Sequence, residues 1–279
     1  HGGAFVSSNT EYVIEAAQYA SPLENKKFFP LEEFNEKYRG GVTYWKFDRK
    51  EGRIDTKKSF SLELPPYSQD LSDFGKGPSD GWMFFTSYNS EQANTLLEVN
   101  ASKNDKDYIA AVNYRAAEAC AKAGKGVRAP AEYRHNIFDE FSRIARSERM
   151  TSVLQIQAAA CPGSIYFLPT PKSPHGADVD PTGEYIVAGG KLATVIPVHS
   201  ATKMLKAIAD RQFEGELEGI PVLKYESTLA GEVQEPGLGP LHTEFDGQGF
   251  AYTSMFISSE VVKWNVETRQ VVDRAPTFY

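Results

Sequence analysis

Short stretches rich in aromatic and β-branched residues recur along most of the chain, and glycine, proline, aspartate or asparagine bounds each of them. Such stretches predict β-strands, because these side chains pack well on a pleated surface while the flanking residues favour turns. The predicted strands include Thr43–Phe47, Ser59–Leu64, Trp82–Thr86, Tyr108–Val112, Tyr185–Ala188 and Val261–Trp264. Many short strands joined by polar turns predict an all-β fold, which could be a sandwich, a barrel or a propeller.

Two segments depart from this pattern. Residues Arg115 to about Ala160 are rich in Ala, Glu, Lys and Arg, and Thr202–Phe213 carries one apolar stripe. The apolar positions at helical spacing are Ile137, Phe141 and Ile144 in the first segment, and Met204, Leu205 and Ile208 in the second. Both segments are predicted to be helical insertions that serve packing.

Three histidines, His1, His175 and His242, stand at the same place in what read as copies of one structural unit. Each is followed about ten residues later by an aromatic strand, as His175 is followed by a turn and then Tyr185. This repetition favours a β-propeller with several blades of roughly 40 to 50 residues. Because a radial repeat brings equivalent positions towards one axis, the three imidazoles could meet in a metal site. Structural histidines, hydrogen-bonded within each blade, would fit the repeat equally well.

Composition narrows the class of protein. The chain has 279 residues, 41% of them hydrophobic, which is enough to bury a sizeable core. Its 30 basic and 37 acidic residues give a formal charge of -7, which argues against a nucleic-acid-binding surface. No run of apolar residues is long enough for a transmembrane helix. The chain is expected to be a piece of a longer protein, cut at both ends.

Cys120 and Cys161 are the two cysteines. Their wide spacing predicts neither a disulfide framework nor a thiolate metal site, so both are expected to be inert or weakly exposed thiols.

Several longer motifs, in order along nearly the whole chain, resemble the nitrous oxide reductase family. They are His1–Gly3, Thr86–Glu91, Pro174–Gly176, Asp178–Tyr185, Gly237–Thr243, Glu244–Gly247, Tyr252–Ser254 and Val261–Asn265. The opening His1–Phe5 and the run Leu64–Tyr67 are similar to the second branch of that family, whose members are exported by the general secretory route.

The resemblance implies a seven-bladed propeller that holds a four-copper, sulfide-bridged cluster on its axis through seven histidines. Nitrous oxide would be reduced there to dinitrogen and water with two electrons and two protons. His1, His175 and His242 would be three of the seven ligands. Residues 1–279 would form part of the N-terminal propeller domain and would be inactive alone. The C-terminal cupredoxin domain, with its two-copper electron-entry site, would be absent.

The resemblance also implies a periplasmic homodimer that receives electrons from a c-type cytochrome or a cupredoxin. Neutral imidazole suits copper in either oxidation state, so the three histidines are predicted to be ligands and not acid–base catalysts. Their second ring nitrogens need hydrogen-bond partners, and three aspartates lie near in sequence: Asp178, Asp180 and Asp246. His135 and His199 are expected to be ordinary histidines.

A calcium site is implied by the segment after Tyr88. The matching ligands are the carbonyls of Tyr88 and Val99, the side chain of Glu91, and Asp107 with Asp105 as its alternative. Hard oxygen ligands of this kind suit calcium. A solvated acidic loop is the other interpretation, and Ser173 departs from the asparagine that much of the family has there.

Two other functions remain open at this point. A mononuclear copper monooxygenase could bind its metal through the amino group and imidazole of His1. The repeated turn and strand after His1 and the lack of an expected disulfide disfavour it. A propeller without chemistry could serve as a binding scaffold, and it would tolerate loss of the histidines.

Overall fold

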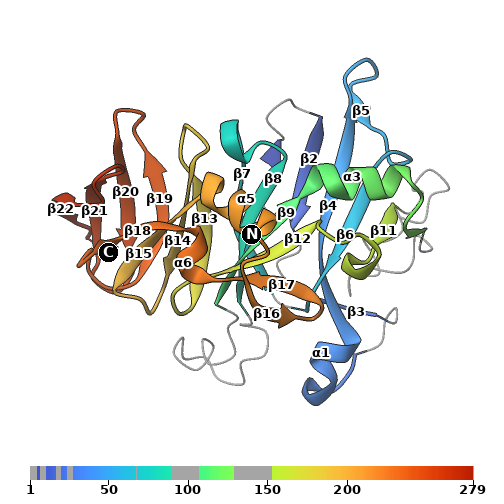
Figure 1. Ribbon diagram of the computed structural model, residues 1–279, viewed down its shortest axis with the longest axis horizontal. Coiled ribbons are helices and arrows are strands. Elements are labelled where there is room, and N and C mark those ends of the chain that lie inside the picture. The colour runs from blue at the N-terminus through green and yellow to red at the C-terminus, as the bar shows by residue number, and fades with distance from the viewer. Residues whose placement is uncertain are drawn as a thin grey trace. The chain divides into compact units, whose positions relative to one another are not determined.

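The chain is built mainly from β-strands, which fall into two units (Figure 1). The computed structural model describes residues 5–6, 11–16, 20–23, 28–66, 68–88, 107–128 and 153–278. The first unit contains His1–Gln69 and Tyr114–Ser164, and the second contains Asp70–Asn113 and Ile165–Tyr279. Several residues singled out above lie outside the described ranges: His1, Glu91, Val99, Asp105, His135, Ile137, Phe141 and Ile144.

The first unit is organised around one sheet with strand order β1-β2-β4-β6-β11-β10. Its strands are β1 (Phe5–Val6), β2 (Tyr12–Ala16), β4 (Tyr38–Asp48), β6 (Phe60–Leu64), β10 (Val127–Arg128) and β11 (Leu154–Ile156), while β3 (Ser21–Pro22) and β5 (Arg53–Ile54) also pair with β4. The helices are η1 (Leu31–Glu33), α1 (Phe34–Lys37), α3 (Tyr114–Lys122) and η5 (Ala158–Ala160). Four buried aromatic rings form the centre of this unit: Tyr12, Tyr44, Phe60 and Tyr114.

The helical segment predicted from Arg115 to Ala160 is only partly correct. Helix α3 confirms its beginning, but Val127–Arg128 and Leu154–Ile156 form strands β10 and β11. These strands pair with each other, and β11 pairs in parallel with β6. Hydrogen bonding to an existing sheet edge therefore outweighs the local helical preference, which is a weak determinant of structure.

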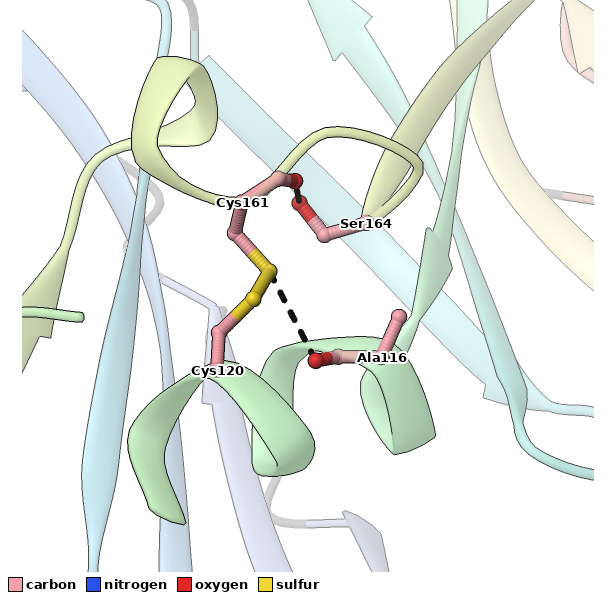
Figure 2. Close-up of a disulfide and its surroundings, with 4 residues drawn as sticks. All are labelled: Ala116, Cys120, Cys161 and Ser164. Carbon is pink, nitrogen blue, oxygen red and sulfur yellow. Dashed lines mark hydrogen bonds between the residues drawn. A yellow bond between two sulfur atoms is a disulfide. The ribbon is translucent and has the colours of Figure 1, made fainter. Parts of the chain in front are cut away.

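The cysteine prediction is wrong, because Cys120 and Cys161 form a disulfide (Figure 2). Cys120 lies on α3, and Cys161 follows directly after η5. Their Cα atoms are 6.0 Å apart, and Cys161 is buried. A separation of 41 residues gave no sign of this pairing, since only the folded chain brings α3 and η5 together.

The second unit contains a six-stranded sheet and two four-stranded sheets. The six-stranded sheet has the order β16-β17-β12-β9-β8-β7. Its strands are β7 (Ser68–Phe74), β8 (Trp82–Tyr88), β9 (Tyr108–Asn113), β12 (Ile165–Pro169), β16 (Phe213–Leu217) and β17 (Ile220–Leu223). The short helix η2 (Gly77–Ser79) connects β7 and β8.

The four-stranded sheets have the up-and-down antiparallel order of propeller blades, and they are drawn in gold to red in Figure 1. The first blade contains β13 (Pro174–Val179), β14 (Tyr185–Gly190), β15 (Val195–Ser200) and β18 (Leu229–Gln234), and the second contains β19 (Pro240–Phe245), β20 (Phe250–Met255), β21 (Glu260–Asn265) and β22 (Val271–Pro276). All six strands named from the sequence are found. The all-β prediction, a propeller with helical insertions, is confirmed.

Helix α5 (Ala201–Ala209) confirms the second predicted helix, although the helix ends earlier than expected. Ser200 caps it by accepting a hydrogen bond from the Lys203 amide at 3.0 Å. Met204 is buried in the core shared with β13 and β14, whereas Leu205 is 36% exposed and lies off the packing face. Phe213, the predicted end of the helix, instead begins β16. Short helix α6 (Tyr225–Thr228) follows β17.

Candidate metal site

His175 and His242 occupy equivalent places in consecutive blades. His175 is the second residue of β13 and His242 is the third residue of β19, and each strand is the first of its blade. The two strands contact each other, and the imidazole centroids lie 5.0 Å apart with an interplanar angle of 66°. The radial repeat therefore brings these two predicted ligands together, although 67 residues separate them in sequence.

Both histidines lie where the pairing of their strand is interrupted. The register of β13 against β14 shifts between His175 and Ala177, and that of β19 against β20 shifts between Pro240 and Thr243. Such β-bulges change the direction of the neighbouring side chains and are common next to functional sites. The bulges thus give each imidazole an orientation that regular strand alternation would not provide.

Two glycines allow the histidine-bearing strands to approach closely. Gly176 has φ +75°, and a Cβ there would lie 2.1 Å from Cε1 of the His242 ring. A Cβ at Gly189, which pairs with His175, would lie 2.0 Å from the Leu241 carbonyl oxygen. The space taken by the His242 ring and the backbone beside it exists because both positions lack a side chain.

Asp178 connects the two strands through its carboxylate. Oδ2 accepts a hydrogen bond from the Thr243 amide at 2.7 Å, and Oδ1 lies 3.4 Å from Nδ1 of His242. The backbone of β19 is therefore fixed next to β13, and the carboxylate faces one ring nitrogen of His242. The other nitrogen, Nε2, is buried and points away from this contact. A carboxylate in this position orients an imidazole for metal binding through its opposite nitrogen.

The carboxylate of Asp73 stabilises the backbone of β13. Oδ2 of Asp73 accepts a hydrogen bond from the Val179 amide at 2.9 Å. Burial raises the pKa of Asp73 above its usual value, even though the amides of Val179 and Phe74 donate to it. This contact holds the backbone one residue after Asp178.

The other two aspartates suggested by the sequence have a different role. Asp180 accepts hydrogen bonds from the amides of Thr182 and Tyr185, and Asp246 accepts them from Gln248 and Phe250. Each stabilises the turn after the first strand of its blade. Of the three aspartates, Asp178 is the one that faces His242.

His199 is confirmed as an ordinary core histidine. It lies in β15, is fully buried, and its Nδ1 is 2.9 Å from Oγ1 of Thr228. Burial lowers its pKa to about 4.

The predicted calcium ligands are described only in part. Tyr88 ends β8. The carboxylate of Asp107 accepts a hydrogen bond from the Ser173 amide at 2.9 Å and lies 3.6 Å from Nζ of Lys172. These contacts place Asp107 beside the segment that leads into His175. Ser173 is buried with φ 60°, a conformation that asparagine adopts more readily than serine.

Across the described ranges, no group of three or more His, Cys, Asp or Glu side chains is arranged to hold a metal ion. His1, the third predicted ligand, lies outside them, so its meeting with His175 and His242 stays a prediction.

Curated relatives match up to 65% of this chain. The chain is 31% identical over 182 residues to a nitrous-oxide reductase of Stutzerimonas stutzeri, covering 65% of this chain and 24% of that protein. It is similar to nitrous-oxide reductases. The enzyme of Pseudomonas fluorescens is 32% identical over 189 residues, with the same coverage of 65% and 24%. The enzyme of Cupriavidus necator is 39% identical over 101 residues, covering 36% of this chain and 14% of the enzyme.

The resemblance to nitrous-oxide reductases is therefore confirmed. The chain spans about a quarter of the length of the first two relatives, in which 24% is covered. No protein-family model matches it.

Solved structures show a likeness in fold alone. Hydrazine synthase of Kuenenia stuttgartiensis superposes with a TM-score of 0.51 at 13% identity, covering 93% of this chain and 57% of that one. The periplasmic gluconolactonase PpgL of Pseudomonas aeruginosa gives a TM-score of 0.50 at 12% identity, covering 98% and 56%. These propeller-like neighbours agree with the blade topology.

No pattern in the sequence indicated the bulges, the close approach at Gly176 and Gly189, or the disulfide. Gly176, directly after His175, was visible in Pro174–Gly176, but its contact with His242 depends on a distant strand. The disulfide removes one reason for disfavouring a mononuclear copper monooxygenase. The turn and strand repeated after each histidine still disfavour it.

Proposed function

We propose that the chain is part of the catalytic propeller of an enzyme that reduces nitrous oxide to dinitrogen and water, with uptake of two electrons and two protons. The observation that carries this proposal is the pairing of His175 and His242, 5.0 Å between centroids, within a sequence similar to nitrous-oxide reductases. In this proposal His1, His175 and His242 are part of the ligand set of a four-copper, sulfide-bridged cluster.

The residues fit a copper centre in their chemistry and their arrangement. Imidazole is a borderline-soft, neutral ligand that binds copper in both oxidation states. Asp178 faces Nδ1 of His242, which leaves Nε2 as the nitrogen for a metal. Gly176 leaves open the space that the His242 ring occupies. When bound, the cluster would supply the stored electrons for the reduction.

The chain's own residues would act by binding and orientation. His175 and His242 would provide neutral nitrogen ligands from two rigid strands, so that little movement accompanies electron transfer. Asp178 would keep His242 in one tautomer and one orientation. Asp73 would hold the strand that carries Asp178 through the Val179 amide.

We also propose a domain organisation, a compartment, an oligomeric state and an electron donor for the whole protein. Residues 1–279 would belong to an N-terminal propeller domain, and a separate cupredoxin domain would carry the two-copper electron-entry site. The whole protein would be a periplasmic homodimer that accepts electrons from a c-type cytochrome or a cupredoxin. The disulfide between Cys120 and Cys161 supports an oxidising compartment, where such bonds persist. In the described part of the chain, no helix is long and apolar enough to cross a membrane.

Calcium is a further part of the proposal, with the Tyr88 and Val99 carbonyls, Glu91 and Asp107 as ligands. Asp107 already binds the Ser173 amide through Oδ1, so Oδ2 would be the oxygen offered to the ion in competition with Lys172. An ion there would stabilise the segment that leads to His175.

Copper reconstitution of the full-length protein that contains this chain would test the ligand assignment. His175→Ala and His242→Ala should each abolish nitrous oxide reduction and the visible absorption of the copper–sulfide centre, because each removes a ligand. Asp178→Asn should lower copper affinity about 10- to 100-fold, as losses of such supporting contacts do. His135→Ala is the matched control and should retain activity and absorption. Wild-type turnover in either ligand variant would overturn the assignment and favour a binding scaffold.

A further inference from the structure

The first unit contains a cavity of about 470 Å³ that includes none of the candidate metal ligands. Its volume lies in the range of roughly 300 to 1,000 Å³ that is typical of small-molecule sites. Among its lining residues are Tyr12 of β2, Lys46 of β4, Lys122 of α3, Arg128 of β10 and Leu154 of β11. With Phe60 of β6, residues from six elements thus surround one space.

The lining is strongly basic in an acidic protein. Five lysine and arginine side chains and two glutamates contribute, which gives a formal charge of +3, whereas the whole chain carries -7. The five cations are Lys46, Lys57, Lys58, Lys122 and Arg128. A concave surface lined by one sign of charge focuses the electrostatic potential and attracts ions of the opposite sign.

Both glutamates of the lining form ion pairs with basic side chains. Glu11 forms ion pairs with Lys46 at 3.2 Å and with Arg115 at 2.8 Å. Glu118 pairs with Lys122 at 3.1 Å and accepts a hydrogen bond from the Tyr12 hydroxyl. These contacts compensate the carboxylates together with Lys46 and Lys122, and Lys58 is likewise ion-paired with Asp55 at 3.0 Å.

Lys57 and Arg128 lie together at the rim. The Arg128 guanidinium donates a hydrogen bond to the Lys57 carbonyl oxygen at 2.8 Å, and both residues line the cavity. Guanidinium and ammonium groups both donate charge-assisted hydrogen bonds to carboxylates and phosphates, so two such residues side by side favour an anion.

The remaining lining includes apolar surface. Leu154 and Ala121 line the cavity together with Tyr12 and Phe60, whose rings pack edge-to-face at 5.8 Å. A basic rim over apolar side chains suits a molecule with one anionic end and one apolar end.

We propose that this cavity binds a small organic anion, with its carboxylate or phosphate held by Lys57 and Arg128 and its apolar part against Leu154. The site is independent of the histidine pair and of the proposed reduction of nitrous oxide.

Three probes that share a phenyl ring test the charge requirement: benzoate, phenyl phosphate and the neutral benzamide. Titrations of the chain by calorimetry or by amide chemical shifts should show saturable binding of benzoate or phenyl phosphate, and the stronger of the two identifies the head group. Benzamide should bind at least about tenfold more weakly, because it lacks the charge. Added salt should weaken anion binding, since charges at an exposed rim are screened.

A pair of double variants separates the site from general electrostatics. Lys57→Gln/Arg128→Gln should weaken binding about tenfold or more, whereas Arg53→Gln/Lys125→Gln should leave it unchanged. The control removes the same residue types and the same charge from exposed positions of the same unit. Because Arg128 also binds the backbone, Lys57→Gln alone serves as the variant that leaves that contact intact. Equal weakening in both double variants, equal affinity for benzamide, or an absence of saturable binding would each overturn the proposal.

Discussion

His199 differs from the candidate metal ligands in the burial of its side chain. His199 is fully buried next to Thr228 and the ring of Tyr225, whereas 30% of the His242 side chain is exposed and a carboxylate faces it. A buried imidazole without a facing carboxylate resists protonation, and burial lowers the pKa of His199 to about 4. The same residue type therefore serves packing in β15 and metal binding, as we propose, in β13 and β19.

The low pKa of His199 predicts that the folded protein loses stability in acid. The folded-state pKa of His199 is about 4 and the unfolded value is 6.5, so the unfolded chain binds more protons between these pH values. His199 alone should therefore lower the free energy of unfolding by about 3 kcal/mol as pH falls from 7 to 4. Denaturant titrations across this range should show a smaller loss for His199→Asn than for the wild type. Parallel pH profiles for the two proteins would contradict the prediction.

At the scale of elements, the bulge in β13 depends on Gly176. Its positive φ and the nearby His242 ring both disfavour a side chain, whereas Gly219 in the turn between β16 and β17 has a similar φ of +74° with open space around it. The two positions therefore share a similar φ and differ in crowding.

Alanine substitutions at Gly176 and Gly219 would measure the energetic cost of this crowding. Gly219→Ala should cost about 1–2 kcal/mol of unfolding free energy, the penalty for a left-handed residue with a Cβ. Gly176→Ala should cost about 1–3 kcal/mol more, because the His242 ring must move away. Urea unfolding gives both values, and the His242 ring resonances should shift only in Gly176→Ala. Equal costs, with unchanged resonances, would mean that Gly176 is not needed to seat His242.

At the scale of the whole molecule, the disulfide adds a covalent constraint to a chain composed of many short strands. Cys120 and Cys161 close a loop of 41 residues in the first unit. Such a cross-link stabilises mainly by restricting the unfolded chain. Such bonds persist in oxidising compartments, which agrees with the periplasmic location that we propose.

Replacing both cysteines should therefore reduce stability. Cys120→Ser/Cys161→Ser is expected to lose about 2–4 kcal/mol of unfolding free energy. Reductant should destabilise the wild type by a similar amount and leave the variant unaffected, which denaturant titrations with and without reductant can measure. Rapid alkylation of both cysteines in the native, unreduced protein would contradict the disulfide.

The sequence by itself determined the features that depend on local pattern. Short stretches of aromatic and β-branched residues predicted the strands, and the turn after His175 predicted the strand that begins at Tyr185. The repeat placed His175 and His242 at equivalent positions, because one structural unit gives one position the same environment in every copy.

Only the tertiary structure decided which groups meet. The bulges, the contact of His242 with Gly176, the choice of Asp178 among three aspartates and the pairing of Cys120 with Cys161 all join residues far apart in sequence. Strands β10 and β11 likewise formed against a helical preference because β6 offered a hydrogen-bonding edge. Such contacts depend on the packing of distant segments, and no local periodicity records them.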